Sequence, residues 1–397
     1  MILLHDICDA IDFYTMNKLI YLNRCIFHNV PRITDYRYFP FATIKKGPAT
    51  TSFIPAPDIW QPPTIEYQFK QQPLSAELIP LLDQTGTTAC IVMQQNQILF
   101  EHYANGYTKD SINTSFSVAK SMVAVLVGIA LDEGLITSIE DPIGKYLPHF
   151  QHGSITIGHL LTMSSGLSYQ EGVTPWSDDA KVYYGLNLRE QALKAKVIES
   201  PGTTYHYNNY NLLLLGLILE KVTGVPVPQY FQEKIWQYIG AEADASWSLD
   251  SKTSGFAKME SGFNARAMDF VRFGALCLQG GKMNGRQIVS TDWLHEAVCP
   301  PATKPDSKKY LGVLNPPLSR WTASNHGYYK YLWWGWKIDD STFDYFALGA
   351  KGQFIYICPR TQAVIVRFGK KWGSVDWWPA ILKQIGDSLG INSKPTD

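Results

Sequence analysis

The sequence lacks the patterns that mark a zinc hydrolase, a disulfide scaffold or a nucleic-acid-binding protein. Its six cysteines include no Cys-x-x-Cys pair and its nine histidines form no His-Glu-x-x-His pattern, which disfavours both a metal site and a disulfide framework. Lysine plus arginine equals aspartate plus glutamate, 35 each, so nothing favours nucleic acid or an anionic membrane as a partner. We expect no metal, no cofactor, and buried free thiols at Cys8, Cys25, Cys90, Cys277, Cys299 and Cys358.

A recognisable signal peptide and a clear membrane span are also missing. Residues 1–4 are apolar, but Asp6, Asp9 and Asp12 follow where a signal peptide needs a basic start and an uninterrupted hydrophobic stretch. The sequence therefore favours a cytoplasmic location, with a periplasmic one left open if the true start lies upstream. The oligomeric state stays open.

Hydrophobic patterns place strands near both ends of the chain and helices between them. Helices are predicted from Ser117 to a stop at Gly134, and over 157–163, 211–222, 270–278 and 378–389. Strands are predicted over 88–93, 98–103, 331–338, 343–348, 353–358 and 363–368.

This order predicts an α+β fold, in which one antiparallel sheet is assembled from both ends of the chain and flanked by helices. We expect residues 1–60 to form an N-terminal extension, 61–115 and 331–397 a sheet domain, and 116–330 an inserted helical domain. The active site should lie in the cleft between the last two.

The tetrapeptide Ser117-Val118-Ala119-Lys120 precedes a long apolar run. Residues three apart on a helix share a face, so the amine of Lys120 would reach the hydroxyl of Ser117. A serine becomes a good nucleophile when a neighbouring base accepts its proton, and burial can lower a lysine pKa enough for this. A plainer interpretation is a helix start capped by Thr114 or Ser115, with Lys120 in solvent.

A second candidate group follows in Tyr207-Asn208-Asn209, between a Pro-Gly loop and an apolar helix. A phenol beside an ammonium can ionise below its usual pKa and act as a base, so Tyr207 could pass a proton to a leaving group. The alternative is a loop tyrosine that caps the next helix. The segment 348–353 (Leu-Gly-Ala-Lys-Gly-Gln) contains three small residues, which would let a substrate approach the main chain. It would suit an edge strand whose backbone N–H completes an oxyanion hole with that of Ser117. The alternative is a plain glycine turn.

Together these segments resemble the serine β-lactamase-like hydrolase superfamily, the penicillin-recognising fold, in which Ser-x-x-Lys carries the nucleophile. The resemblance covers roughly residues 85 to 372. It rests on the Ser117 tetrapeptide and on the segments 155–167, 201–209, 263–274 and 352–358 with Pro359.

Within this superfamily the sequence most resembles the branch whose members use a catalytic tyrosine. That branch comprises class C-type β-lactamases, D-amino-acid peptidases, family VIII esterases and 6-aminohexanoate-dimer hydrolases. No Ser-Asp-Asn occurs, and Gly349-Ala350-Lys351-Gly352 stands where a Lys-Thr-Gly is expected. The resemblance implies Ser117, Lys120 and Tyr207 as catalytic residues and the N–H groups of Ser117 and Ala350 as oxyanion donors. It also implies substrate contacts from Tyr169, from Asn209, which would orient Lys120 or a substrate amide, and from Lys351 toward a carboxylate.

The sequence thus predicts a serine hydrolase that cleaves small-molecule esters or linear amides through an acyl-enzyme on Ser117. Two alternatives remain open. One is a β-lactamase or D-amino-acid peptidase on the same scaffold, and the other is a non-catalytic binding or assembly module with the penicillin fold.

Overall fold

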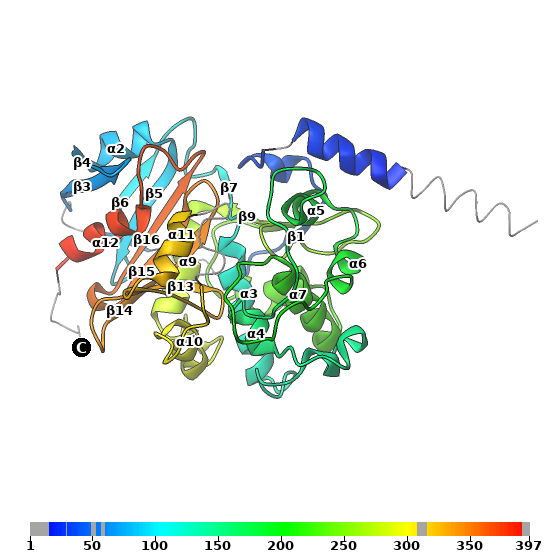
Figure 1. Ribbon diagram of the computed structural model, residues 1–397. Helices are drawn as coiled ribbons and strands as arrows, with labels where there is room; N and C mark the ends of the chain where they lie inside the picture. Colours follow the sequence, from blue (N-terminus) through cyan, green and yellow to red (C-terminus); the bar gives the residue numbers. More distant parts are fainter. Residues whose placement is uncertain (1–15, 29, 49–52, 57–59, 308–315, 391–397) are drawn as a thin grey trace, which may run out of the picture.

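The computed structural model of the protein describes all residues except 1–15, 29, 49–52, 57–59, 308–315 and 391–397. A sheet with its covering helices fills one side of the molecule, and a mainly helical region fills the other (Figure 1). The predicted α+β fold is confirmed, with an antiparallel sheet flanked by helices.

The main sheet joins the two ends of the chain. The hairpin β5 (Thr87–Gln94) and β6 (Gln97–Tyr103) pairs antiparallel with the late strand β16 (Ala363–Gly369) through β5. The strand order is β12-β13-β14-β15-β16-β5-β6-β2. The remaining members are β12 (Gly327–Lys330), β13 (Trp333–Lys337), β14 (Phe343–Gly349), β15 (Gln353–Cys358) and β2 (Ile54–Pro55), which is parallel to β6.

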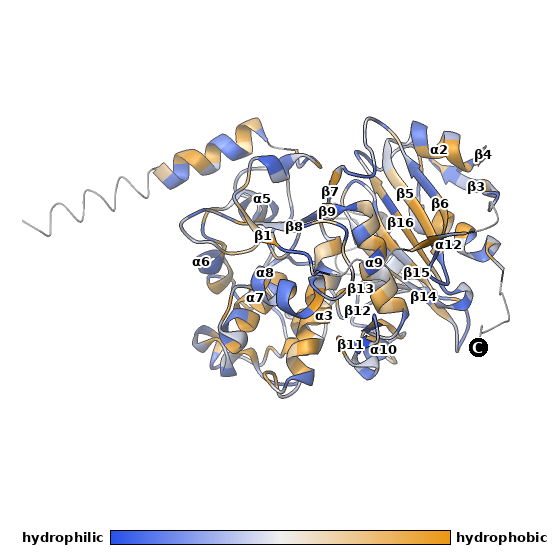
Figure 2. Ribbon diagram, turned by 180° about the vertical axis from the view of Figure 1, so that it is seen from behind, coloured by the Kyte–Doolittle hydropathy of each residue, from blue (hydrophilic) through white to orange (hydrophobic). Residues whose placement is uncertain are grey.

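The centre of this sheet is buried on both faces. All residues of β5, β15 and β16 are buried, and these strands are strongly apolar in Figure 2. Helices α9 (Ala267–Leu278) and α12 (Trp378–Ser388) cover opposite faces. A Cβ at Gly274 of α9 would meet Val364, and one at Gly386 of α12 would lie by Ile365, the next residue in β16. Successive strand residues point to opposite faces, so the two helices enclose the sheet.

The helical region is built around α3 (Val118–Asp132) and α7 (Tyr210–Thr223), which pack against each other. Every residue of α3 from Val118 to Ala130 is buried, so it is a core helix rather than an amphipathic surface helix. Around it lie α4 (Ile157–Leu161), α5 (Asp178–Tyr184), α6 (Leu188–Leu193), α8 (Val227–Phe231) and a π-helical turn (Gln232–Trp236).

A second, four-stranded sheet leads into α3. Its order is β1-β8-β9-β7, with β1 (Phe41–Ile44), β8 (Ala245–Ser248), β9 (Phe263–Arg266) and β7 (Ile112–Thr114). The sequence did not predict it. A strand from the N-terminal segment therefore belongs to the same sheet as the strand before Ser117. The proposed domain limits remain a prediction. Helix α9 lies within residues 116–330, the predicted helical domain, yet it packs on the main sheet.

A helix over residues 16–27 lies at the N-terminal end of the described chain, and several shorter elements are present besides it. They are the hairpins β3 (Thr64–Phe69) with β4 (Gln72–Glu77) and β10 (Lys282–Met283) with β11 (Arg286–Gln287), the helices α2 (Leu78–Gln84), α10 (Thr291–Val298) and α11 (Pro316–Ala323), and 3₁₀ turns at Asp35–Arg37, Ile143–Lys145, Pro148–Phe150 and Pro359–Thr361.

The cysteines within the described chain are unpaired. Cys25, Cys90, Cys277 and Cys358 are buried free thiols, as predicted, whereas Cys299 is only partly buried at the end of α10. Cys8 lies outside the described residues, as do residues 1–4 and the three aspartates that follow. Within the part of the chain that the structure describes, no group of three or more His, Cys, Asp or Glu side chains could hold a metal ion.

None of the described helices is, by itself, long and apolar enough to cross a membrane. The segments Tyr210–Thr223 and Val227–Trp236 meet that test only as a pair, bent by 72°.

Candidate active site

Ser117 lies at the N-cap of α3, directly after a strained residue. Phe116 has a φ of 43°, which lies in the left-handed region. Residues with bulky side chains rarely adopt this backbone conformation, and those that do are concentrated at functional sites. The Ser117 side chain makes no capping hydrogen bond, so its hydroxyl is not committed to the helix end. The plainer interpretation, with Thr114 or Ser115 as cap and Lys120 in solvent, is wrong.

Lys120 points back along α3 to the nucleophile. Its Nζ lies 2.8 Å from Ser117 Oγ and donates to the backbone carbonyl of Glu260 at 2.9 Å. The side chain is 1% exposed. Burial lowers the pKa of Lys120 to about 7, against the opposing attraction of Glu260 and Asp179. A large share of Lys120 is therefore a neutral amine near pH 7, which can accept a proton.

Tyr207 completes the predicted group. Its ring centroid lies 5.0 Å from Lys120 Nζ, and its phenol is hydrogen-bonded to Ser117. The rings of Tyr329 and Trp334 pack beside it, with centroids 6.1 and 5.9 Å away. The three residues predicted as catalytic thus meet at one point.

The structure corrects the expected ionisation of Tyr207. Burial raises the pKa of its phenol above the usual value, and the hydrogen bond from Ser117 only partly opposes this. The sequence interpretation assumed an ammonium on Lys120 that would stabilise a phenolate, but burial lowers the pKa of that group to about 7. The two shifts together favour a protonated phenol on Tyr207 and a Lys120 amine that can accept a proton.

The turn between β14 and β15 reaches the nucleophile from the sheet. A Cβ at Gly349 would lie 2.4 Å from Ser115 O and 3.1 Å from Ser117 N, so the glycine allows the main chain to approach the start of α3. The expectation of an edge strand is wrong, because β12 and β13 lie outside β14. However, β13 pairs only with residues 343–346, which leaves the end of β14 beyond the β13 ladder.

Ala350 follows Gly349 and is exposed. Among the residues that the structure describes, neither its N–H nor that of Ser117 donates to a backbone carbonyl, so both amides remain available as the predicted oxyanion donors. Buried Arg367 supports the turn, because its Nη1 donates to the carbonyls of Lys351 at 3.0 Å and Gly352 at 2.7 Å. Gly352 has a φ of 81°, which favours glycine.

The three residues predicted to contact substrate, Tyr169, Asn209 and Lys351, have different surroundings in the structure. Asn209 Nδ2 donates to Tyr169 OH at 2.8 Å, and that phenol donates to Asp179 Oδ1 at 2.6 Å. Asn209 therefore orients Tyr169 and not Lys120, which corrects one of its two predicted roles. Its Oδ1 is buried and without a partner in the described chain, so a contact to a substrate amide stays a prediction. Lys351 lines a pocket together with residues of the N-terminal segment, and its contact to a carboxylate stays a prediction.

Two functional contacts could not be found from the sequence. The Glu260 carbonyl that fixes Lys120 comes from a loop with no motif. Asp179 lies in the first turn of α5, where Ser177 caps the helix, so its sequence signal is an ordinary helix start. Burial raises the pKa of Asp179, partly opposed by its hydrogen bonds to Tyr169 and Gly172.

The fold and this site together point to one class of protein. A hydroxyl and a buried amine at the start of a core helix, beside a phenol and the end of a sheet strand, are the arrangement expected of a serine hydrolase. Comparison with known proteins agrees: the Beta-lactamase family model matches residues 77–380. The chain belongs to the beta-lactamase family.

Similarity to individual proteins covers between 41% and 92% of the chain in the following three examples. A 6-aminohexanoate-dimer hydrolase from Paenarthrobacter ureafaciens is 26% identical over 310 residues, which is 74% of this chain and 75% of that protein. A teichoic acid D-alanine hydrolase from Staphylococcus aureus (strain MRSA252) is 27% identical over 41% of this chain and 40% of its own length. A solved structure of a candidate 6-aminohexanoate-dimer hydrolase from Bacillus anthracis aligns with a TM-score of 0.75 at 22% identity, covering 92% of this chain and 94% of that one.

Proposed function

We propose that this protein is a serine hydrolase that cleaves ester or linear amide bonds through an acyl-enzyme on Ser117. The observation that carries the proposal is the 2.8 Å contact between Ser117 Oγ and the buried amine of Lys120. With a pKa of about 7, that amine is matched to proton transfer near neutral pH.

The acylation step uses the three residues in order. Ser117 Oγ attacks the substrate carbonyl carbon while its proton passes to the neutral amine of Lys120. Tyr207 donates its phenol proton to the leaving alcohol or amine and recovers one from the Lys120 ammonium. The balance is one new Ser117–acyl bond, one broken ester or amide bond, and a site returned to its neutral state.

Deacylation runs the same sequence with water in place of Ser117. Water attacks the acyl carbon and gives its proton to the neutral amine of Lys120, while Tyr207 donates its phenol proton to the departing Ser117 oxygen. Tyr207 then recovers a proton from the Lys120 ammonium, which returns the site to its neutral state. In both steps the N–H groups of Ser117 and Ala350 would stabilise the tetrahedral oxyanion. Removing one such donor costs on the order of 10²–10³ in kcat.

Substrate preference follows from the strand beside the site. The Lys-Thr-Gly that the resemblance associates with β-lactam and peptidoglycan recognition is missing, and a relative matched over 74% of this chain is named a 6-aminohexanoate-dimer hydrolase. Esters and linear amides are therefore favoured over β-lactams and D-peptides.

A substrate panel tests the proposal. Turnover of p-nitrophenyl esters, linear amides, a D-alanyl peptide and nitrocefin would be measured for the wild type, Ser117→Ala and Tyr207→Phe. We expect ester or amide turnover that both variants lose, with unfolding curves unchanged. Preferential nitrocefin or D-peptide turnover would assign the rival hydrolase activities, and no turnover of any substrate would favour a non-catalytic module.

A further inference from the structure

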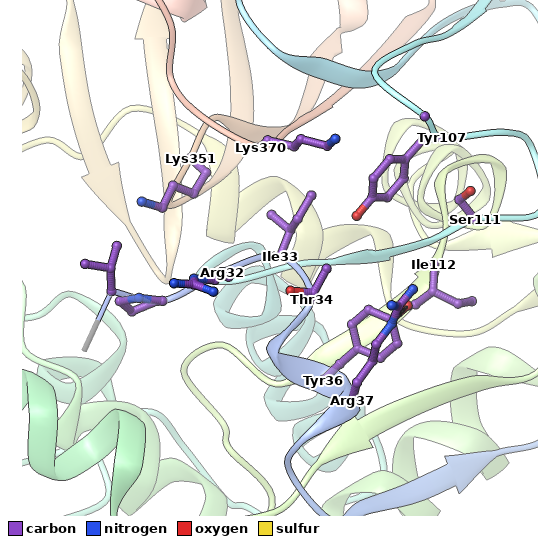
Figure 3. Close-up of a pocket in the computed structure, with 13 residues that line it drawn as sticks. Arg32, Ile33, Thr34, Tyr36, Arg37, Tyr107, Ser111, Ile112, Lys351 and Lys370 are labelled. Carbon is purple, nitrogen blue, oxygen red and sulfur yellow. Dashed lines mark hydrogen bonds between the residues drawn. The ribbon is translucent and has the colours of Figure 1, made fainter. Parts of the chain in front are cut away.

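A pocket lies between the N-terminal segment and the turns that follow β14 and β16 of the main sheet. It encloses about 430 Å³. In Figure 3, Arg32, Tyr36 and Arg37 come from the N-terminal segment, and Lys351 and Lys370 come from the turns that follow β14 and β16, with their amines pointing in opposite directions. Val30, Pro31, Ile33, Thr34, Gly106, Tyr107, Ser111 and Ile112 complete the lining.

The charge of this pocket has one sign. Arg32, Arg37, Lys351 and Lys370 line it, and none of the thirteen lining residues is acidic. In a chain with 35 basic and 35 acidic residues, a concave surface with four cations and no carboxylate is a local excess that attracts anions.

Two carboxylates lie in the chain segments next to this lining. Asp35 is 2% exposed, and its Oδ2 accepts from the Arg32 backbone N–H at 2.8 Å and from Tyr183 OH at 3.0 Å. Its Oδ1 has no hydrogen-bond partner in the described chain, and its charge attracts Arg32. Asp110 pairs with Arg266 at 3.0 Å, outside the pocket lining. Among the described residues, no carboxylate forms an ion pair with the side chains of the four lining cations.

Aromatic rings hold two of the cations in place. Lys370 Nζ lies 5.6 Å from the ring centroid of Tyr107, and the guanidinium of Arg37 lies 5.6 Å from that of Tyr36. These contacts limit the movement of both side chains while leaving their N–H groups free of a competing anion.

Two residues that line the pocket, Lys351 and Ile33, are close to segments that contact the backbone near Ser117. Lys351 is two residues after Gly349, whose Cβ position lies 3.1 Å from Ser117 N. On the opposite side, Thr114 Oγ1, three residues before Ser117, donates to the carbonyl of Ile33 at 3.0 Å. The lining residues Lys351 and Ile33 are therefore each linked, through Gly349 and Thr114, to the backbone around Ser117.

We propose that this pocket binds an oxyanionic group, a carboxylate or a phosphate, on the substrate or leaving group. The inference rests on the proposed hydrolase function and names its substrate class: molecules whose ester or amide bond is tethered to an anion. The N-terminal segment then acts as part of the substrate-binding surface.

Direct binding tests the pocket independently of turnover. Calorimetry on the Ser117→Ala protein would use two probes, pyrophosphate and tricarballylate, which separate phosphate from carboxylate ligands. We expect saturable binding of at least one, weakened on the order of 10-fold in an Arg32→Gln/Lys351→Gln variant and further weakened by salt. Lys252→Gln removes one exposed lysine outside the pocket and should leave the affinity unchanged.

Turnover then tests the role of the pocket with substrate. p-Nitrophenyl monoesters of dicarboxylic acids with four to eight carbons would be compared with their neutral methyl esters. The acid-to-ester ratio of kcat/KM should exceed one at the best chain length and fall in the Arg32/Lys351 variant. Absence of anion binding, or binding with a ratio that the variant leaves unchanged, would overturn the proposal. Absence of all turnover would overturn the hydrolase function and leave the binding result standing.

Discussion

At the scale of single residues, the Lys120 amine is governed by two opposing effects. Burial removes water from its ammonium, which disfavours the charged form, while Glu260 and Asp179 favour it. Burial dominates, and the pKa falls to about 7 from the ordinary lysine value. The carboxylates only moderate the shift, partly because Asp179 is itself buried with a raised pKa.

This balance predicts the pH dependence of hydrolysis. Below pH 7 Lys120 is protonated and cannot accept the Ser117 proton, so kcat/KM for a neutral ester should rise with pH and level off above about 7. Lys120→Ala should lower kcat/KM by about 10²–10⁴, and Lys120→Arg, which stays protonated, should fail similarly. A profile that is flat between pH 5 and 9 would show that another group is the base.

At the scale of elements, the β14–β15 turn and the start of α3 must approach closely. Gly349→Ala places a methyl group 2.4 Å from Ser115 O, so the turn must move away from Ser117. We expect a destabilisation of about 1–3 kcal/mol and a fall in kcat/KM of at least about 10-fold, because an oxyanion donor is misplaced. Unfolding curves and ester turnover measure the two effects.

A second glycine provides the matched control. Gly158 of α4 has its nearest neighbour 3.4 Å from the Cβ position, an ordinary contact, so Gly158→Ala should leave activity within about twofold and stability unchanged or slightly increased. If Gly349→Ala behaved like Gly158→Ala, the β14–β15 turn would have no part in catalysis.

Some helices and strands could be predicted from the sequence, and others could not. Strong periodicity located α7, the β5–β6 hairpin and the late strands β14 to β16, because long apolar runs have few alternative structures. The four-residue strands β1 and β9 escaped prediction, since their pairing depends on partners distant in the chain.

The candidate site also contains features that the sequence predicts and features that it does not. Ser117 and Lys120 are three residues apart on one helix, so local geometry brings them together. The ionisation of Tyr207 and the partner of Asn209 depend on tertiary structure. The sequence interpretation was wrong for the first and for one of the two roles predicted for Asn209, the orientation of Lys120. The Glu260 carbonyl is a backbone group that any residue could supply.

At the scale of the whole molecule, the N-terminal segment is part of the folded body. Ile44 of β1 is fully buried opposite Ala245 in β8, and Arg24 Nη1 donates to the Asp250 carbonyl at 2.9 Å. The predicted extension is thus tied to both the helical region and the strand that precedes Ser117.

Core membership of β1 is testable by one substitution. Ile44→Ala should lower the free energy of unfolding by about 2–5 kcal/mol, as expected for a buried isoleucine. Phe41→Ala in the same strand removes a side chain that is 58% exposed and should change it by about 0.5 kcal/mol or less. Equal effects in denaturant unfolding would contradict the burial of β1.

The central claim is that Ser117 is a nucleophile activated by its surroundings. Its most direct test is intact-mass and peptide-mapping analysis after treatment with a fluorophosphonate, which labels activated serines. We predict one stoichiometric adduct on the peptide that contains Ser117, absent from Ser117→Ala, strongly slowed in Lys120→Ala and unchanged in Ser154→Ala, which alters an exposed serine. A folded wild-type protein with no adduct, or with its adduct on another residue, would contradict the account.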